Sequence, residues 1–193
     1  MEKFEEHHEE FNYSYEDPFY LISLNEDGCN KLLKYIDGLS EDDWAIHQTN
    51  YKDKENFRLC DIHCPNQNSP MSTIGASIFE LVNNKYYQFD ISIFEFQLLR
   101  YREGGKFEWH CDYGTAPKKD VWRKLSLSVQ LSRPEDYDGG ELVIVDYYNQ
   151  HCEIPKSLGA SVVFDSRCPH KAEPITRGER YVLVGWASGP KLR

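Results

Sequence analysis

Long apolar runs are missing from this sequence. No stretch approaches the roughly 20 consecutive apolar residues that a helix needs to cross a bilayer. The first residues, MEKFEEHHEEF, have neither the basic start nor the apolar core of a secretory signal. We therefore expect no membrane partner and a cytoplasmic location.

Basic residues are also scarce. The chain has 22 Lys and Arg against 32 Asp and Glu, which gives a formal net charge of −10. An acidic protein does not favour the phosphate backbone, so no nucleic-acid partner is expected. Disulfides are not expected either, because the six cysteines of a cytoplasmic protein remain thiols.

Internal repeats and low-complexity linkers are absent as well. The length of 193 residues then predicts a single domain over residues 1–193. We expect a helical N-terminal part over about residues 19–85 and a β-rich core over about residues 86–190.

Two groups of histidines and cysteines resemble metal sites but lack the required pattern. His7 and His8 lie in an acidic arm over residues 1–18, which we interpret as a solvated terminus. The segment Cys60–Cys64 has no second ligand pair at a zinc-like spacing. Its alternation of side chains favours a strand.

The N-terminal half predicts two helices among short strands. Asn25 is a candidate cap for a helix that ends near Asp37, and Ser72 or Thr73 for a second helix through Val82. From residue 86, β-branched and aromatic runs alternate with glycine-rich turns. This pattern predicts an all-β sandwich or barrel after two helices, with strand candidates at 19–24, 44–49, 86–101, 107–113, 124–132, 141–147, 151–154, 160–165 and 180–187, and a polar loop at 51–56.

The triplet His110-Cys111-Asp112 carries the main chemical signal. Residues two apart on a strand share a face, so His110 and Asp112 can bind one ion while Cys111 faces away. His170 follows 60 residues later, after an apolar strand. Two imidazoles and one carboxylate suit a non-haem Fe(II) ion and leave positions open for a co-substrate and oxygen. A His-x-Asp triplet alone arises often by chance, but the later histidine and the Gly-Gly-Glu-Leu turn strengthen the interpretation.

Arg180 lies ten residues after His170 and opens an apolar strand. Its guanidinium suits a buried carboxylate, and a dicarboxylate co-substrate is the natural partner. The alternative is a surface ion pair with Glu179. Arg177, closer to a turn, is expected to be solvated.

Tyr101 and Gln130 are further candidates for contact with the co-substrate. The phenol of Tyr101 suits a hydrogen bond to it, and a core aromatic is the equal alternative. Ser126, Ser128 and Gln130 form the polar face of one strand. Such a row lines a site if it faces the interior of a barrel, and otherwise it faces water.

Three segments, LLRYREGGKFEWHCDY, LSLSVQLSRPEDYDGGEL and SLGASVVFDSRCPHKAEPITRGERYVLVGWASGP, resemble the prolyl 4-hydroxylase-type branch of the 2-oxoglutarate/Fe(II) oxygenases. The likeness is strongest to bacterial and phage hydroxylases and covers about residues 86–190. It implies a double-stranded β-helix (jelly roll, cupin-like) and Fe(II), 2-oxoglutarate and O2, with ascorbate as a further candidate. It also implies iron ligands His110, Asp112 and His170, with Arg180 on the distal carboxylate of 2-oxoglutarate and Tyr101 beside it.

The resemblance predicts a dioxygenase that hydroxylates an unactivated C–H bond, with a peptidyl proline as the first candidate. The alternatives are a hydroxylase of a free amino acid or small metabolite, and a catalytically silent β-sandwich that only binds. Arg180 stands where collagen-type enzymes usually carry lysine, which weakens the case for a collagen-like substrate. Specificity is expected in loops around the mouth, near residues 50–70, 113–123 and 133–138, where Trp109, Tyr113 and Trp122 are candidate lining residues.

Overall fold

The computed structural model describes residues 18–51, 54–114 and 120–191. Its two α-helices are α1 (Glu26–Asp37) and α2 (Pro70–Val82), with short helical turns at Glu41–Asp43, Asn83–Tyr87 and Pro134–Asp136. The strands are β1 (Phe19–Ser23), β2 (Ala45–Tyr51), β3 (Lys54–His63), β4 (Ile93–Tyr101), β5 (Lys106–His110), β6 (Val121–Gln130), β7 (Tyr137–Gly139), β8 (Leu142–Val145), β9 (His151–Glu153), β10 (Ala160–Asp165), β11 (His170–Ala172), β12 (Ile175–Gly178) and β13 (Arg180–Pro190).

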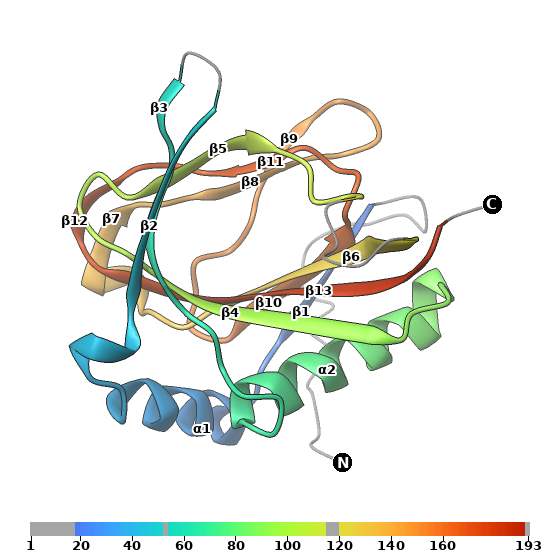
Figure 1. The fold of residues 1–193 in the computed structure, drawn as a ribbon, viewed down its shortest axis with the longest axis horizontal. Coiled ribbons are helices and arrows are strands. Elements are labelled where there is room, and N and C mark those ends of the chain that lie inside the picture. Colours follow the sequence, from blue (N-terminus) through green and yellow to red (C-terminus); the bar gives the residue numbers. More distant parts are fainter. Residues whose placement is uncertain (1–17, 52–53, 115–119, 192–193) are drawn as a thin grey trace.

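Eleven of these strands form one antiparallel sheet that curls back on itself, and Figure 1 shows its two layers. One layer has the order β1-β10-β6-β13-β4-β3, with β2 added to β3. The sheet continues from β3 through β5, β11, β8 and β9, which form the opposite layer. The curled sheet is the predicted double-stranded β-helix, and its interior lies between the two layers.

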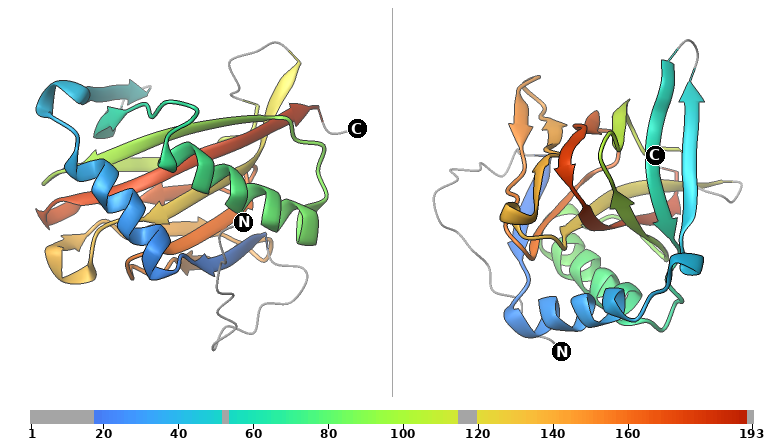
Figure 2. Two further views of the ribbon diagram at one scale, coloured as in Figure 1. Left: turned by 90° about the horizontal axis from the view of Figure 1, so that it is seen from below. Right: turned by 90° about the vertical axis from the view of Figure 1, so that its left-hand side faces the viewer.

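Both helices cover the outer side of the layer that contains β4 and β13 (Figures 1 and 2). Helix α1 begins as predicted, because the Asn25 side chain accepts a hydrogen bond from the backbone N–H of Gly28 at 2.8 Å. Apolar side chains of both helices, among them Leu32 and Phe79, are fully buried in the core beneath them.

The second helix begins earlier than predicted. Its cap is Ser69, whose side chain accepts a hydrogen bond from the backbone N–H of Ser72 at 3.2 Å. Ser72 and Thr73, the predicted caps, lie in the first turn instead. Pro70 explains the shift, because proline fits the first helical position, where no N–H is needed.

Alternate side chains of β4, β6 and β13 face opposite sides of their layer. One set packs against the helices and forms the main core, with Leu98, Leu125, Val129 and Leu183 among its members. The other set faces the interior between the layers and contributes to a cavity there: Leu99, Tyr101, Ser126, Ser128, Arg180, Val182, Val184 and Trp186. Two members of the polar row of β6, Ser126 and Ser128, therefore line this cavity, and Gln130 is not among its lining residues.

Two further predicted segments differ from the observed structure. Residues 86–92 are not strand, because a π-helical turn over Asn83–Tyr87 extends α2 and β4 begins only at Ile93. The side chain of Asn83 exchanges hydrogen bonds with the backbone N–H and C=O of Phe89, which fixes this connection. The predicted loop at 51–56 is mostly strand, because β2 and β3 form a hairpin that projects from the body in Figure 2, with residues 52–53 outside the described part.

Four smaller sequence predictions concern the segment around Cys60, the cysteines, membrane spans and the N-terminal arm. The segment from Cys60 to His63 lies on β3, as its alternation indicated. All six cysteines are free thiols. Across the described ranges, no helix is long and apolar enough to cross a membrane. The acidic arm with His7 and His8 lies outside the described residues, except for Pro18.

Candidate metal centre

His110, Asp112 and His170 come together between the two layers of the sheet. Their ligand atoms all lie within 4.8 Å of one another, and in the described part of the chain this is the one such cluster of histidine, cysteine and acidic groups. His110 ends β5 and His170 begins β11, and the two are paired in register. The structure therefore brings together the three residues that the sequence spacing had singled out.

The local geometry of Asp112 differs from the prediction. Strand β5 ends at His110, so Asp112 lies in the connection that follows and not on the strand face. The backbone N–H groups of Asp112 and Tyr113 donate to the carbonyl oxygen of Ser166, at 3.0 and 2.9 Å. This anchor turns the chain so that the carboxylate reaches the two imidazoles, while Cys111 is exposed.

Both imidazoles are oriented by backbone carbonyls. Nδ1 of His110 lies 2.7 Å from the carbonyl oxygen of Glu108. Nδ1 of His170 lies 3.1 Å from that of Cys168. A carbonyl only accepts hydrogen bonds, so each Nδ1 carries the proton and each Nε2 keeps its lone pair. Burial lowers the pKa of His110, and the nearby His170 adds to this effect, which favours the neutral form that binds metals.

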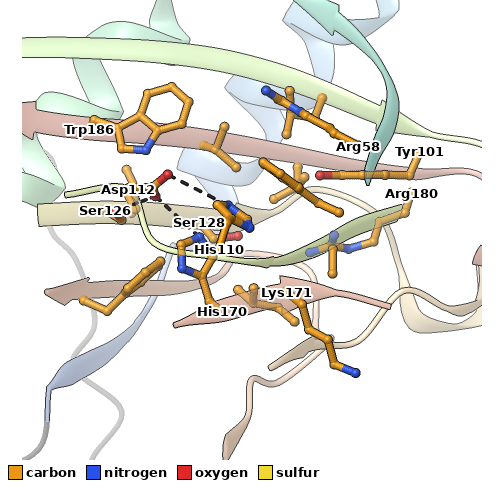
Figure 3. Close-up of a pocket in the computed structure, with 18 residues that line it drawn as sticks. Arg58, Tyr101, His110, Asp112, Ser126, Ser128, His170, Lys171, Arg180 and Trp186 are labelled. Atoms are coloured by element: carbon orange, nitrogen blue, oxygen red, sulfur yellow. Dashed lines mark hydrogen bonds and ion pairs between the residues drawn. The ribbon is translucent and has the colours of Figure 1, made fainter. Parts of the chain in front are cut away.

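The Asp112 carboxylate faces both imidazoles (Figure 3). Its oxygens lie 3.9 Å from Nε2 of His110 and 3.4 Å from Nε2 of His170. The Ser126 hydroxyl donates to Asp112 Oδ2 at 2.8 Å. Burial raises the pKa of Asp112, but His170, His110 and hydrogen bonds from Trp186 and Ser126 outweigh it and hold the pKa below its usual value. The site therefore offers two neutral imidazole nitrogens and a carboxylate, a donor set that suits Fe(II).

The three residues line a cavity that also contains Arg180. All four side chains are among the residues that line this cavity. Arg180 is only 5% exposed, and its Nε donates to Gln130 Oε1 at 3.0 Å. The alternative of a surface pair with Glu179 is wrong, because Glu179 binds Arg102 and the Tyr181 hydroxyl instead.

Gln130 contacts Arg180 and also Tyr137, a residue that no sequence pattern singled out. Its Nε2 donates to the Tyr137 hydroxyl at 2.8 Å, while its Oε1 accepts from Arg180. Gln130 is therefore placed to orient the guanidinium. Tyr101 is buried. The centre of its ring lies 5.7 Å from the guanidinium carbon of Arg180. Tyr137 lies in a segment whose apolar residues follow no regular spacing. The pairing of β7 with β12 places its side chain in the interior.

Several other candidates lie away from the cavity. Trp109 packs against His151 and Lys171, and Tyr113 packs against Trp122. None of the three aromatics is among the residues that line the cavity. Arg177 is half-exposed and pairs with Asp138 at 2.6 Å, as its position near a turn indicated. The loop at 113–123 is described only in part, because residues 115–119 lie outside the described ranges.

Residues 96–188 match the model of the 2OG-Fe(II) oxygenase superfamily. A PKHD-type hydroxylase of Pseudomonas putida strain F1 is 41% identical over 90 residues, which cover 45% of this chain and 39% of that protein. The match thus spans about two fifths of the length of this curated relative.

Two solved structures share the fold. A prolyl-4-hydroxylase of Pseudomonas putida has a TM-score of 0.70 at 20% identity, covering 89% of this chain and 92% of the other. A prolyl hydroxylase of Trichoplax adhaerens, in complex with a peptide fragment of the hypoxia inducible factor oxygen degradation domain, has a TM-score of 0.67 at 19% identity. That match covers 88% of this chain and 83% of the other.

Proposed function

We propose that the chain is an Fe(II)- and 2-oxoglutarate-dependent dioxygenase, because residues 96–188 match the model of the 2OG-Fe(II) oxygenase superfamily. The proposed reaction is hydroxylation of an unactivated C–H bond, with a peptidyl proline as the substrate. One observation carries the proposal: His110, Asp112 and His170 converge in the same cavity as the buried Arg180.

Fe(II) would be held by Nε2 of His110, Nε2 of His170 and the carboxylate of Asp112. The residues fit this role, because the carbonyls of Glu108 and Cys168 leave both Nε2 atoms free of protons. Three protein ligands on one side leave coordination positions for a co-substrate and oxygen. When bound, the iron supplies the oxidative chemistry that couples decarboxylation of 2-oxoglutarate to hydroxylation of the substrate.

Arg180 would bind the distal carboxylate of 2-oxoglutarate. A guanidinium remains charged when buried and offers paired donors that match a carboxylate. Gln130 accepts a hydrogen bond from its Nε, so a neutral amide holds the guanidinium in position. Burial raises the pKa of Tyr101, so its hydroxyl stays protonated and is available as a donor to the same ligand.

The cavity walls are otherwise largely apolar, with Leu99, Leu142, Val182 and Val184 among the lining residues. These side chains keep water away from the reacting groups. In such a dry site the contacts of Arg180 and Asp112 with their ligands are stronger than in water. The protein thus contributes orientation and exclusion of water, while the cofactor contributes the oxidation.

Two observations support a peptide substrate. Both solved structures named above are prolyl hydroxylases, and the one from Trichoplax adhaerens holds a peptide. The β2–β3 hairpin projects beyond the body of the molecule (Figure 2). Arg58, on β3 of this hairpin, is one of the residues that line the cavity. A hairpin in this position offers a surface along which an extended peptide can lie.

The test is a mass-spectrometric screen. The protein is incubated with Fe(II), ascorbate and 2-oxoglutarate, and with peptides that contain proline in varied contexts. We expect succinate release together with a gain of one oxygen on a peptide, and loss of both in His170→Ala. Oxygen added only to free amino acids would favour the small-metabolite alternative. Absence of any 2-oxoglutarate turnover would refute the proposed activity.

A further inference from the structure

Arg58 is a cation of the cavity that neither the metal site nor the proposed co-substrate site accounts for. It lies on β3 and is one of the residues that line the cavity. Figure 3 shows its side chain on the far side of His110 from His170, between Trp186 and Tyr101. No sequence pattern singled it out, because residues near 50–70 were expected to form a loop at the mouth of the site.

The contacts of Arg58 leave its charge without a counter-ion. One terminal nitrogen donates to Gln97 Oε1 at 3.1 Å, and the guanidinium carbon lies 4.8 Å from the centre of the Phe107 ring. Its Nε is buried and has no hydrogen-bond partner. Among the ion pairs of the described residues, none involves Arg58. A neutral amide and an aromatic face orient a guanidinium but do not neutralise it.

The other charges around the cavity have partners of their own. Asp112 faces His110 and His170. Lys171 pairs with Glu173 and lies 5.0 Å from the centre of the Trp109 ring. If Arg180 binds 2-oxoglutarate, Arg58 is the remaining positively charged residue of the cavity lining that lacks an anionic partner. A partly buried charge without a counter-ion is costly, so an anionic ligand group is its expected partner.

Arg58 and Arg180 are held on different strands. The acceptor of Arg180 is Gln130 on β6, and the acceptor of Arg58 is Gln97 on β4. Strand β13 lies between these two strands and pairs with both. The two acceptors are therefore separated by two strand spacings, roughly 10 Å. Because of this separation, we expect a small dicarboxylate bound by Arg180 not to reach Arg58 as well. Arg58 is then available to bind a different molecule.

We infer that Arg58 binds a carboxylate of the substrate, so that the enzyme selects substrates with an anionic group beside the oxidised carbon. This inference rests on the proposed function and makes its substrate class more specific. The carboxylate belongs to a free amino acid, to the C-terminus of a peptide, or to an acidic side chain next to the target residue. A wholly neutral peptide leaves Arg58 unpaired.

The experiment measures binding without turnover. The full chain is loaded with Mn(II) and 2-oxoglutarate, and tryptophan fluorescence follows titration with matched probes. The pairs are proline and prolinamide, N-acetylproline and N-acetylprolinamide, and peptides that place Asp or Asn beside proline. Arg58→Gln and Arg58→Lys are compared with Arg102→Gln, which removes the same charge from a half-exposed site outside the cavity lining.

In the wild type we expect at least one carboxylate probe to bind about tenfold more tightly than its amide, the size of one charge-assisted hydrogen bond. The pair that shows the preference identifies the source of the carboxylate. Arg58→Gln should abolish the preference, Arg58→Lys should keep part of it, and Arg102→Gln should keep all of it.

Three results would overturn the inference. The first is equal affinity for every carboxylate probe and its amide in the wild type, a result that does not depend on whether any variant folds. The second is a preference that survives in folded Arg58→Gln. The third is a loss of 2-oxoglutarate affinity in Arg58→Gln, measured without substrate, that is as large as the loss of affinity for the carboxylate probe. This result would assign Arg58 to the co-substrate. Failure of the proposed activity is a separate result, seen as absence of succinate.

Discussion

The side chains of Arg180 and Gln130 are joined by a hydrogen bond of 3.0 Å from Nε to Oε1, and Arg180 also lines the cavity that contains the candidate metal ligands. The other end of Gln130 donates to the Tyr137 hydroxyl. The amide therefore fixes both the position and the rotation of the guanidinium, and it does so without neutralising the charge. The full charge of Arg180 remains available to an anionic ligand.

This relationship predicts that Gln130 controls the affinity for 2-oxoglutarate. Gln130→Glu has the same size but places a carboxylate against Arg180. The internal ion pair competes with the ligand, so we expect the KM for 2-oxoglutarate to rise more in Gln130→Glu than in Gln130→Ala. Steady-state succinate assays at varied 2-oxoglutarate measure this. Equal KM values in wild type and Gln130→Glu would mean that Arg180 does not bind the co-substrate.

A second prediction concerns the hydrogen bond from Ser126 to Asp112, which is 2.8 Å long. Ser126→Ala removes this support of a proposed metal ligand. Loss of such outer contacts typically weakens metal affinity by roughly 10–100-fold. Ser128→Ala is the matched control, because Ser128 also lies on β6 and lines the cavity, whereas among the described serines it is Ser126 that donates to Asp112. Anaerobic Fe(II) titration decides the point, and identical affinities in the two variants would refute it.

A third prediction concerns acid stability, through Glu41 and Arg100. Hydrogen bonds from Arg100, with a further one from Arg102, lower the pKa of Glu41 from 4.5 to about 2. A carboxylate with a lowered folded-state pKa stabilises the fold above its unfolded pKa, and that contribution is lost as the pH falls toward the folded value. We therefore expect Glu41→Gln to lower Tm at pH 7.

The same variant should converge with the wild type in acid. The difference in Tm between wild type and Glu41→Gln should shrink as the pH falls from about 4.5 toward about 2. Thermal unfolding across this range measures it. The effect should be modest, because Glu41 is exposed and water screens the pair. A difference that stays constant with pH would contradict the assigned cause.

Local signals explain what the sequence could predict. The Asn25 cap, the alternation of β6 and the burial of Arg180 each depend on a few neighbouring residues, so all three could be inferred. The convergence of His110, Asp112 and His170 was also predictable, because the residue types and spacing are specific in combination. The exact path of the chain at Asp112 was not, since it depends on a hydrogen bond to Ser166 far away in the sequence.

Non-local pairing explains what the sequence missed. Strands β7, β11 and β12 have only three or four residues each and exist because distant segments pair with them. Tyr137 enters the site only through such a pairing. Arg58 was also missed in the sequence analysis, because the polar stretch before it resembled a loop. Only the sheet shows that its side chain enters the cavity.

The most direct test is an anaerobic titration of 2-oxoglutarate into the Fe(II)-loaded protein, followed by the metal-to-ligand absorption band. We expect a saturable band in the wild type and none in His110→Ala. Truncating one member of a desolvated pair costs roughly 2–5 kcal/mol, so Arg180→Ala should shift the midpoint by about 30-fold or more. Arg180→Lys should recover only part of the loss, because an ammonium lacks the planar fork. An unchanged midpoint in Arg180→Ala, or an intact band in His110→Ala, would contradict the proposed site.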